Sequence, residues 1–161
     1  VEFELGGEHY ALDIQLAREI VEMMPITPIP RAPPYLSGVI NLRGEITTII
    51  HLASLLGIQE RDRQANQKII VLMSEFARGA NVGVIVDDVH SVIQVPESDI
   101  ERLGDGLSTE FASFVKGIIK IGGENGEGAG RREDGKRRKE LVIWIDLQKI
   151  VGDRLDPRKG S

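Results

Sequence analysis

The sequence predicts an all-β protein built from two similar small barrels, and three observations support this prediction. Apolar residues make up 41% of the 161 residues but aromatic residues only 4%, so the core must be aliphatic. Ile and Val, which dominate such a core, favour strands. Short apolar runs separated by Gly and Pro are typical of many short strands. Finally, the sequence contains an internal repeat, and each copy predicts a strand followed by one helical turn.

The individual strands can be located from their apolar patterns. The first run alternates apolar with acidic residues, and Gly6-Gly7-Glu8 predicts a hairpin turn within it. Continuous apolar runs, typical of buried strands, occupy residues 69–73, 82–86 and 141–145. Five prolines between residues 25 and 34 predict an extended linker, because Pro fits neither an interior strand nor a helix.

The internal repeat is the most specific feature of the pattern. Residues 45–57 align without a gap against residues 140–152, and the match continues upstream of both. More faintly, residues 10–14 resemble residues 82–86. In each copy a strand runs into one helical turn with apolar residues at i, i+3 and i+4, and the glycine that ends the copy is the predicted C-cap.

The repeat predicts a single domain over residues 1–155 with two barrel subdomains related by a pseudo-two-fold axis. The repeat units are approximately 1–66 and 67–155, and strands may exchange between them. The seam between the units should be apolar, because each half alone buries little surface. Residues 124–139 form a charged, Gly-rich insertion that we expect to be flexible, and residues 156–161 form a polar tail.

Composition excludes several classes of function. The chain has no cysteine, so it has no disulfide framework, thiolate metal site or cysteine nucleophile. The net charge is −5. Residues 124–139 hold six basic and four acidic residues, a charge of +2, which leaves −7 elsewhere and argues against nucleic acid as the main partner. No apolar run approaches the ~18–20 residues that cross a bilayer.

No pattern predicts a catalytic, metal or cofactor site. His9, His51 and His90 are far apart in the sequence, and none has the spacing of metal ligands. Asp87 and Asp88 are adjacent on a predicted strand, so their side chains point to opposite faces and cannot act as a carboxylate pair. We therefore expect a binding protein rather than an enzyme.

The run Gly-Val-Ile-Asn-Leu-Arg-Gly-Glu-Ile at residues 38–46 resembles the central signature of the CheW-like family. Three further stretches are similar to family motifs in order and spacing: Phe3 to Ile20, Val82 to Val89, and Trp144 to Leu147. The resemblance covers residues 3–152. It implies two five-stranded SH3-like barrels with short helical turns and an apolar groove between the barrels.

The resemblance also implies a function. Such a protein is a non-enzymatic, cytoplasmic scaffold of chemotaxis signal transduction. It couples the cytoplasmic tip of a methyl-accepting chemoreceptor to the regulatory domain of a CheA-type histidine kinase. Neither a cofactor nor nucleic acid is expected, and membrane association is only indirect, through the receptor.

The motif supplies candidate partner-binding residues. In the family, the motif arginine and a glutamate after the first hairpin are associated with receptor coupling. The candidates in this sequence are Arg43, Glu19, Asn41, Gly44, Gly38 and Ala17. Without the resemblance, the better explanation of residues 41–44 is a tight hairpin turn with a solvated arginine. Thr48 and His51 depart from the family pattern, which usually has Pro and then Asp or Asn.

Two alternatives stay open. The chain begins at Val1 inside a predicted strand, so it fits equally a CheW-like regulatory domain excised from the kinase or from a multidomain coupling protein. The basic run at 131–139 leaves a small-barrel nucleic-acid-binding module as a further alternative.

Overall fold

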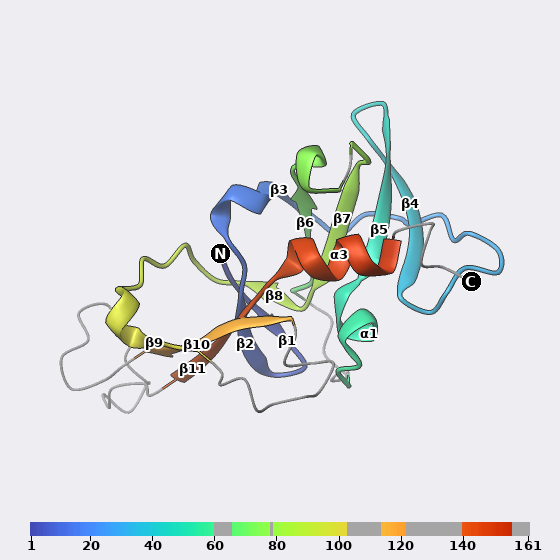
Figure 1. Ribbon diagram of the computed structural model, residues 1–161. Coiled ribbons are helices and arrows are strands. Elements are labelled where there is room, and N and C mark those ends of the chain that lie inside the picture. The colour runs from blue at the N-terminus through green and yellow to red at the C-terminus, as the bar shows by residue number, and fades with distance from the viewer. Residues whose placement is uncertain (60–65, 78, 103–113, 122–139, 156–161) are drawn as a thin grey trace.

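The computed structural model describes residues 1–59, 66–77, 79–102, 114–121 and 140–155, and these ranges are built mostly of β-strands (Figure 1). The strands form two sheets, one with six strands and one with five. The predicted insertion at 124–139 and the tail at 156–161 lie outside the described residues. The all-β, two-barrel prediction is confirmed.

The six-stranded sheet, here called barrel A, has the order β8-β1-β2-β11-β10-β9. Its strands are β1 (Glu2–Leu5), β2 (Glu8–Ala11), β8 (Asp88–Val89), β9 (Ile100–Glu101), β10 (Val115–Ile121) and β11 (Glu140–Ile145). The five-stranded sheet, barrel B, has the order β3-β6-β7-β5-β4. Its strands are β3 (Ala17–Glu22), β4 (Leu36–Leu42), β5 (Glu45–His51), β6 (Lys68–Leu72) and β7 (Val82–Val86).

The extra strand of barrel A is β9, whose two residues pair with β10. In barrel B the proline-rich linker takes the corresponding place. It contributes a single bridge, between Thr27 and Val39, instead of a strand. Prolines lack the N–H that a ladder needs, which explains why the linker pairs at one point only.

In the described residues, the short helices lie between strands, except for the last one, which follows β11. They are η1 (Ile14–Leu16), α1 (Leu52–Leu56), η2 (Ser74–Ala77), η3 (Glu97–Asp99) and α3 (Leu147–Leu155). Gly57 ends α1 with φ 71°, as a C-cap should. The matching prediction for Gly152 is wrong, because α3 continues to Leu155. A glycine inside a helix costs only about 1 kcal/mol, which burial of the apolar face of α3 offsets.

None of the helices in the described ranges is long and apolar enough to span a membrane.

Each barrel contains strands from both halves of the chain. The first hairpin, β1–β2, joins barrel A through a parallel pairing of β2 with β11. The hairpin β6–β7 joins barrel B through a parallel pairing of β7 with β5. In these pairings Tyr10 lies opposite Ile143 and Val82 lies opposite Thr48. The register therefore reproduces the faint alignment of residues 10–14 with residues 82–86.

One large apolar core fills the seam between the two sheets. Its fully buried members come from both barrels, and they include Phe3, Leu5, Ile50, Leu52, Ile70, Val84, Ile145, Leu147 and Ile150. Smaller clusters lie on the other face of each sheet, around Ile49 and Ile69 in barrel B and around Ile119 and Val142 in barrel A. The apolar seam predicted from the repeat is therefore present, and it is packed with side chains.

Candidate partner-binding site

The β4–β5 hairpin ends in a two-residue turn that holds Arg43 in an uncommon backbone conformation. Leu42 pairs with Glu45, so only Arg43 and Gly44 form the turn. Both have positive φ angles, 52° and 87°, as the type I′ turns of tight hairpins require. The Asn41 side chain supports the turn, because its Oδ1 accepts a hydrogen bond of 2.8 Å from the Gly44 N–H.

Arginine is an unusual choice at this position. A left-handed conformation is routine for glycine but costs about 1 kcal/mol or more for a residue with a Cβ atom. Asn or Asp would fit the turn better. Backbone strain of this kind is concentrated at functional sites. The turn therefore favours a role for the Arg43 side chain beyond forming the hairpin.

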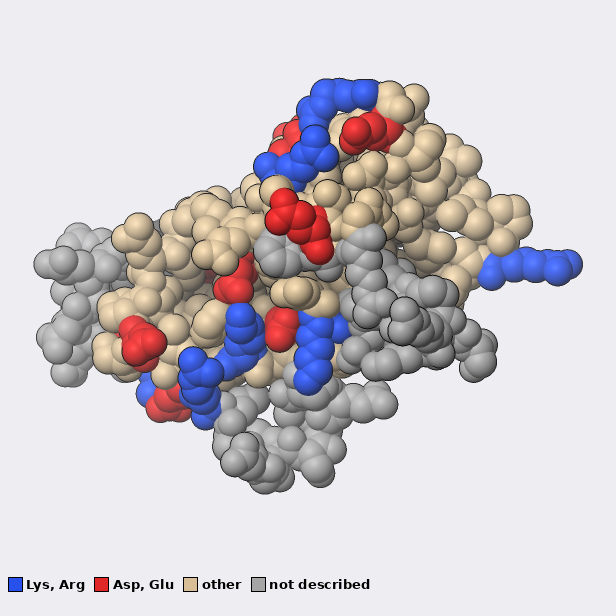
Figure 2. Space-filling model, turned by 45° about the horizontal axis from the view of Figure 1, so that its top comes forward, with Lys and Arg blue, Asp and Glu red and all other residues tan. Residues whose placement is uncertain are grey.

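The structure brings Arg43 and Glu19 together. The Arg43 Nη2 atom donates to Glu19 Oε1, although the residues are 24 positions apart. A second pair lies beside the first, with Arg18 Nη1 3.9 Å from Glu45 Oε2. Figure 2 shows basic and acidic side chains side by side at the upper end of the molecule, where the β4–β5 hairpin ends in Figure 1. Because β3 is one edge of the sheet and the β4–β5 hairpin forms its other end, these ion pairs connect the two ends of the five-stranded sheet.

The Arg43–Glu19 pair leaves Arg43 available to a partner. The Arg43 side chain is 64% exposed, whereas that of Glu19 is 24% exposed. Exposed ion pairs contribute about 0–1 kcal/mol, so a carboxylate or carbonyl of a partner can replace Glu19 at little cost. The guanidinium fork can also bind two groups at once. Glu19 thus orients Arg43 in the free protein without sequestering it.

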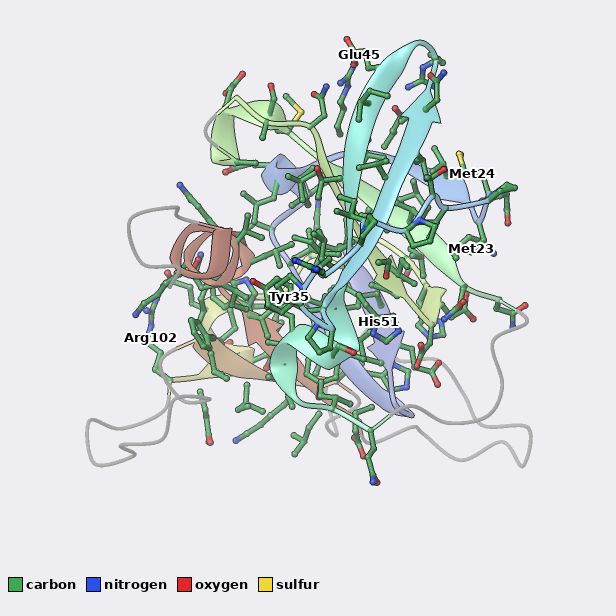
Figure 3. All side chains as sticks on the ribbon, turned by 90° about the vertical axis from the view of Figure 1, so that its right-hand side faces the viewer. Met23, Met24, Tyr35, Glu45, His51 and Arg102 are labelled. Atoms are coloured by element: carbon green, nitrogen blue, oxygen red, sulfur yellow. The ribbon has the colours of Figure 1, made fainter. Side chains whose placement is uncertain are left out.

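Two exposed apolar side chains adjoin these charged residues along the chain. Ile20 follows Glu19 and is 45% exposed, and Ile46 follows Glu45 and is 65% exposed. Figure 3 shows Glu45 at the free end of this hairpin, away from the body of the protein. We call Arg18, Glu19, Ile20, Arg43, Glu45 and Ile46 the hairpin face, although on each strand the isoleucine points away from the glutamate that precedes it. Of these, the sequence pointed to Arg43 and Glu19 only. The period-two pattern of β5, in which Ile46 follows Glu45 on the opposite side, was the available signal for Ile46.

The other two predicted site residues, Gly38 and Ala17, have packing roles. At Gly38, φ is 142° and a Cβ atom would lie 2.1 Å from the Thr27 carbonyl oxygen, so only glycine lets the linker cross β4. Ala17 packs against the central core and pairs with Leu72. A β-bulge follows Ala17, and bulges of this kind re-aim the side chains next to them, here Arg18 and Glu19.

Residues that a catalytic hypothesis would need are engaged in local structure. The Asp87 Oδ2 atom accepts from the Gly6 N–H at 2.7 Å, and Asp88 Oδ1 accepts from the Val89 N–H at 2.8 Å. The two carboxylates therefore do not converge, as predicted. His51 is the N-cap of α1, since its Nδ1 accepts from the Ser54 N–H. This capping role explains why His can stand where the family pattern usually has Asp or Asn.

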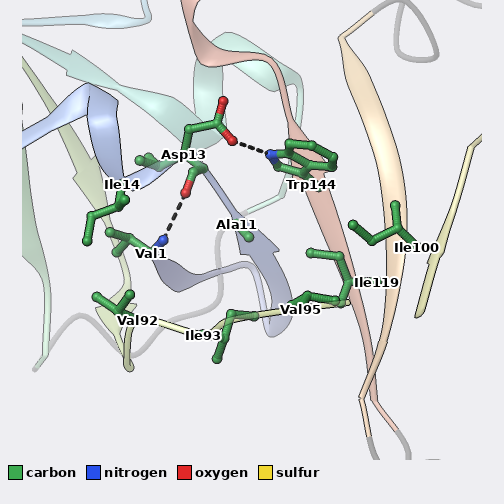
Figure 4. A pocket seen from close by; sticks show the side chains of 11 residues that line it. Val1, Ala11, Asp13, Ile14, Val92, Ile93, Val95, Ile100, Ile119 and Trp144 are labelled. Atoms are coloured by element: carbon green, nitrogen blue, oxygen red, sulfur yellow. Dashed lines mark hydrogen bonds between the residues drawn. The ribbon is translucent and has the colours of Figure 1, made fainter. Parts of the chain in front are cut away.

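A pocket of about 220 Å³ opens beside the interior of barrel A (Figure 4). Aliphatic side chains make up most of its lining, with Trp144 and Asp13 at one edge. The Asp13 carboxylate accepts from Trp144 Nε1 at 2.8 Å and from Lys116 Nζ at 2.9 Å. With Asp13 held in this way, the pocket is suited to an apolar side chain and shows no arrangement for chemistry.

Comparison with known proteins identifies the family of the chain. The CheW-like domain model matches residues 1–155. The chemotaxis protein CheW of Thermotoga maritima is 30% identical over 149 residues, covering 92% of this chain and 84% of the relative. The CheW of Rhizobium meliloti is 33% identical over 76% of this chain and 77% of its own length. The crystal structure of the scaffolding protein TtCheW from Thermoanaerobacter tengcongensis superposes with a TM-score of 0.70. It is 33% identical and covers 93% of this chain and 84% of that one. The chain belongs to the CheW-like domain family.

Proposed function

We propose that this chain, a non-enzymatic adaptor of chemotaxis signalling, binds the cytoplasmic tip of a chemoreceptor through the hairpin face. One observation carries the proposal: the two residues that the family motif singles out, Arg43 and Glu19, meet in an ion pair at the exposed, strained tip of the β4–β5 hairpin. The partners are the helical-hairpin tip of a methyl-accepting receptor and the regulatory domain of a CheA-type kinase. We place the encounter in the cytoplasm, where both partners lie.

The hairpin face suits a helical partner with mixed chemistry. Ile20 and Ile46 offer apolar contacts around Arg43, and a few residues, often arginine among them, supply most of the energy of such interfaces. Arg43 offers a forked donor that fixes orientation through carboxylate or carbonyl oxygens. A partner that supplies an acidic or amide side chain beside an apolar ridge would satisfy both requirements.

Coupling requires a second surface. An adaptor that holds receptor and kinase together must bind the kinase away from the hairpin face. The receptor then biases the kinase because the assembled complex makes different contacts with the active and inactive kinase states. The chain contributes geometry and recognition to this shift, and it needs no reactive group of its own.

Charge reversal at Arg43 tests the proposal. We expect Arg43→Glu to weaken binding of a receptor cytoplasmic fragment by about tenfold or more, which corresponds to ~1.4 kcal/mol. Receptor-dependent kinase activity should fall accordingly, while binding to the isolated kinase stays unchanged. Arg31→Glu is the matched control, because Arg31 is also exposed and also has a positive φ angle, 62°.

A charge swap separates recognition from stability. The double variant Arg43→Glu/Glu19→Arg can re-form the ion pair with its charges exchanged. If Arg43 acts on the receptor, the double variant stays defective in receptor binding. Full rescue would show that the pair only supports the fold, and wild-type coupling by Arg43→Glu alone would remove the hairpin face from the proposal.

A second possibility, that this CheW-like domain is part of a longer protein, also has support. The CheV3 protein of Helicobacter pylori is 26% identical over 89% of this chain, but the match spans only 41% of CheV3. A CheW-like domain therefore also occurs within a longer protein. Sequencing the complete gene distinguishes a single-domain adaptor from a module of a larger coupling protein.

A further inference from the structure

Two ion pairs of opposite direction join β3 to the β4–β5 hairpin. In the inner pair, the acidic Glu19 of β3 meets the basic Arg43 of the turn. In the outer pair, the basic Arg18 of β3 lies 3.9 Å from the acidic Glu45 of β5, measured from Nη1 to Oε2. The strand and the hairpin thus each contribute one acidic and one basic side chain, and charges of both signs lie side by side at this end of barrel B (Figure 2).

A β-bulge makes this arrangement possible. On a regular strand, successive side chains point to opposite faces, so Arg18 and Glu19 could not both reach the same hairpin. The ladder between β3 and β6 pairs Ala17 with Leu72 and Glu19 with Val71, so Arg18 is the extra residue of the bulge. An extra residue interrupts the alternation and re-aims the side chains beside it. Both charges of β3 therefore reach the hairpin.

The outer pair is held more loosely than the inner pair. Arg18 is 46% exposed and Glu45 is 58% exposed, and their separation of 3.9 Å is longer than a hydrogen bond. The inner pair is joined by a hydrogen bond. Because exposed pairs add little to stability, Arg18 and Glu45 can exchange their mutual contact for contacts with a partner.

We infer that Arg18 and Glu45 form a second recognition pair, which selects receptor tips that carry one acidic and one basic side chain at matching positions. The inference rests on the proposed receptor-binding role of the hairpin face and deepens it. Arg43 offers donors only, so it cannot require a cation on the partner. Glu45 adds that requirement, and Figure 3 shows it at the free end of the hairpin, away from the body of the protein. Arg18 suits a carboxylate, which its guanidinium can bind through two hydrogen bonds.

This second pair contributes to specificity more than to affinity. A receptor with matching charges gains two contacts but displaces the contact between Arg18 and Glu45. A receptor with the opposite charges would bring like charges together twice, and such contacts strongly disfavour a wrong partner. Penalties of this kind separate related partners that share the same apolar contacts. We therefore expect the second recognition pair to decide which receptor is accepted.

A charge exchange tests the inference. Arg18→Glu/Glu45→Arg keeps the net charge and can re-form the ion pair, so its Tm should match that of the wild type. Calorimetric titration with a receptor cytoplasmic fragment should show about fivefold weaker binding or more at low ionic strength. The loss should shrink in about 0.5 M NaCl, because salt screens exposed charges. The matched control is Lys68→Glu/Glu22→Lys, which exchanges an ion pair of 3.3 Å at the other end of β3 and should bind the receptor as the wild type does.

A change on the receptor side identifies the cation that Glu45 recognises. In a charge-reversal scan of the receptor fragment, replacement of one lysine or arginine by glutamate should make the fragment bind Glu45→Arg more tightly than the wild-type chain. If no replacement has this effect, the assignment of Glu45 to a receptor cation is wrong.

Wild-type affinity of the exchanged variant, while Arg43→Glu binds weakly, would overturn the second recognition pair and leave the hairpin face in place. An equal loss in the Lys68→Glu/Glu22→Lys control, or a loss that persists in high salt, would indicate a general or structural effect and would also overturn it. Wild-type affinity of Arg43→Glu would instead remove the hairpin face itself. The failure of this inference and the failure of the proposed function are therefore distinguishable.

Discussion

Barrel A and barrel B share a strand order but differ in what lies inside them. Each has the same hydrogen bond at the base of its long hairpin: the His51 N–H donates to the Tyr35 carbonyl, and the Asp146 N–H donates to the Phe114 carbonyl, both at 2.7 Å. Figure 3 shows Tyr35 and His51 near each other, where β5 meets α1. A polar side chain caps the next helix in both, through His51 in one and Asp146 in the other. The frame is therefore common to the two barrels.

The interiors differ position by position. In barrel B the ladder places Val71 beside Gly83 and Gly83 beside Ile49. In barrel A the same places hold Glu2, Ala11 and Trp144. Barrel B is thus aliphatic inside, whereas barrel A has a polar network and the pocket next to it. One frame supports both interiors because the register fixes where each side chain points, whatever its chemistry.

This difference matches what each barrel carries. Barrel B carries the hairpin face, whose strained turn needs a rigid support, and an apolar interior supplies it. Barrel A carries the carboxylate of Glu2, which is tolerated inside only because His9 pairs with it. We therefore expect that moving a residue of one barrel to the equivalent position of the other lowers the free energy of unfolding by different amounts in the two directions.

The largest effect is expected when barrel B receives the carboxylate of barrel A. Val71→Glu buries a charge without a histidine partner and places it opposite Glu19 in the ladder. We expect a loss of at least about 3–5 kcal/mol in the free energy of unfolding, measured by urea denaturation. Glu2→Gln, which keeps hydrogen-bonding atoms in barrel A, should cost at most about 1.5 kcal/mol. Equal losses would mean that the two interiors are equally tolerant of polar groups.

We expect a smaller difference in the free energy of unfolding between alanine variants of two equivalent glycines, Gly38 in barrel B and Gly117 in barrel A. At each glycine a neighbouring segment crosses the hairpin. In Gly38→Ala the new Cβ would meet the Thr27 carbonyl oxygen at 2.1 Å, so backbone must move, and the cost should be about 3 kcal/mol or more. In Gly117→Ala it would meet the Ile100 side chain at 2.8 Å and the Glu101 oxygen at 3.1 Å. A side chain can rotate away, so we expect about 1–2 kcal/mol. Chemical denaturation of both variants checks the ratio, and a greater loss for Gly117→Ala would contradict it.

The frame could be predicted from the sequence because it depends on local signals. Gly6 and Gly7 predict the first hairpin turn, and the prolines predict a linker that is not a strand. The repeat predicts two equivalent hairpins. Contacts between distant residues could not be predicted in the same way. Nothing in the spacing of His9 and His90 indicates that their rings stack, because β1 and β8 meet only after the hairpins exchange between barrels. The C-cap at Gly152 was predicted by analogy with Gly57, and burial of the preceding turns of α3 overrode it.

The site was predictable in part for a similar reason. Asn41, Arg43 and Gly44 form one local turn, so their placement together follows from the sequence. Their contact with Glu19 depends on barrel closure, and only the family motif pointed to it. The resemblance also named Gly38 and Ala17, and the structure shows that both shape the backbone next to the site: Gly38 lets the linker cross β4, and a β-bulge follows Ala17.

The smallest expected effect concerns the hairpin tip, and its sign is the informative quantity. Arg43→Asn places a residue that favours the left-handed conformation before Gly44, which relieves about 1 kcal/mol of strain. Loss of the exposed ion pair with Glu19 costs a few tenths of a kcal/mol. We therefore expect a net gain of about 0.5 kcal/mol in the free energy of unfolding, together with weaker receptor binding.

Arg31→Asn is the matched control, since Arg31 has the same backbone conformation with φ 62°. It should give a similar gain in urea denaturation and leave receptor binding unchanged. A gain of stability coupled to a loss of binding at residue 43 alone means that barrel B carries Arg43 at a cost to its own stability. If Arg43→Asn instead lowers the free energy of unfolding, the ion pair with Glu19 stabilises the protein by more than the strained backbone destabilises it. Arg43 then has a structural role in barrel B.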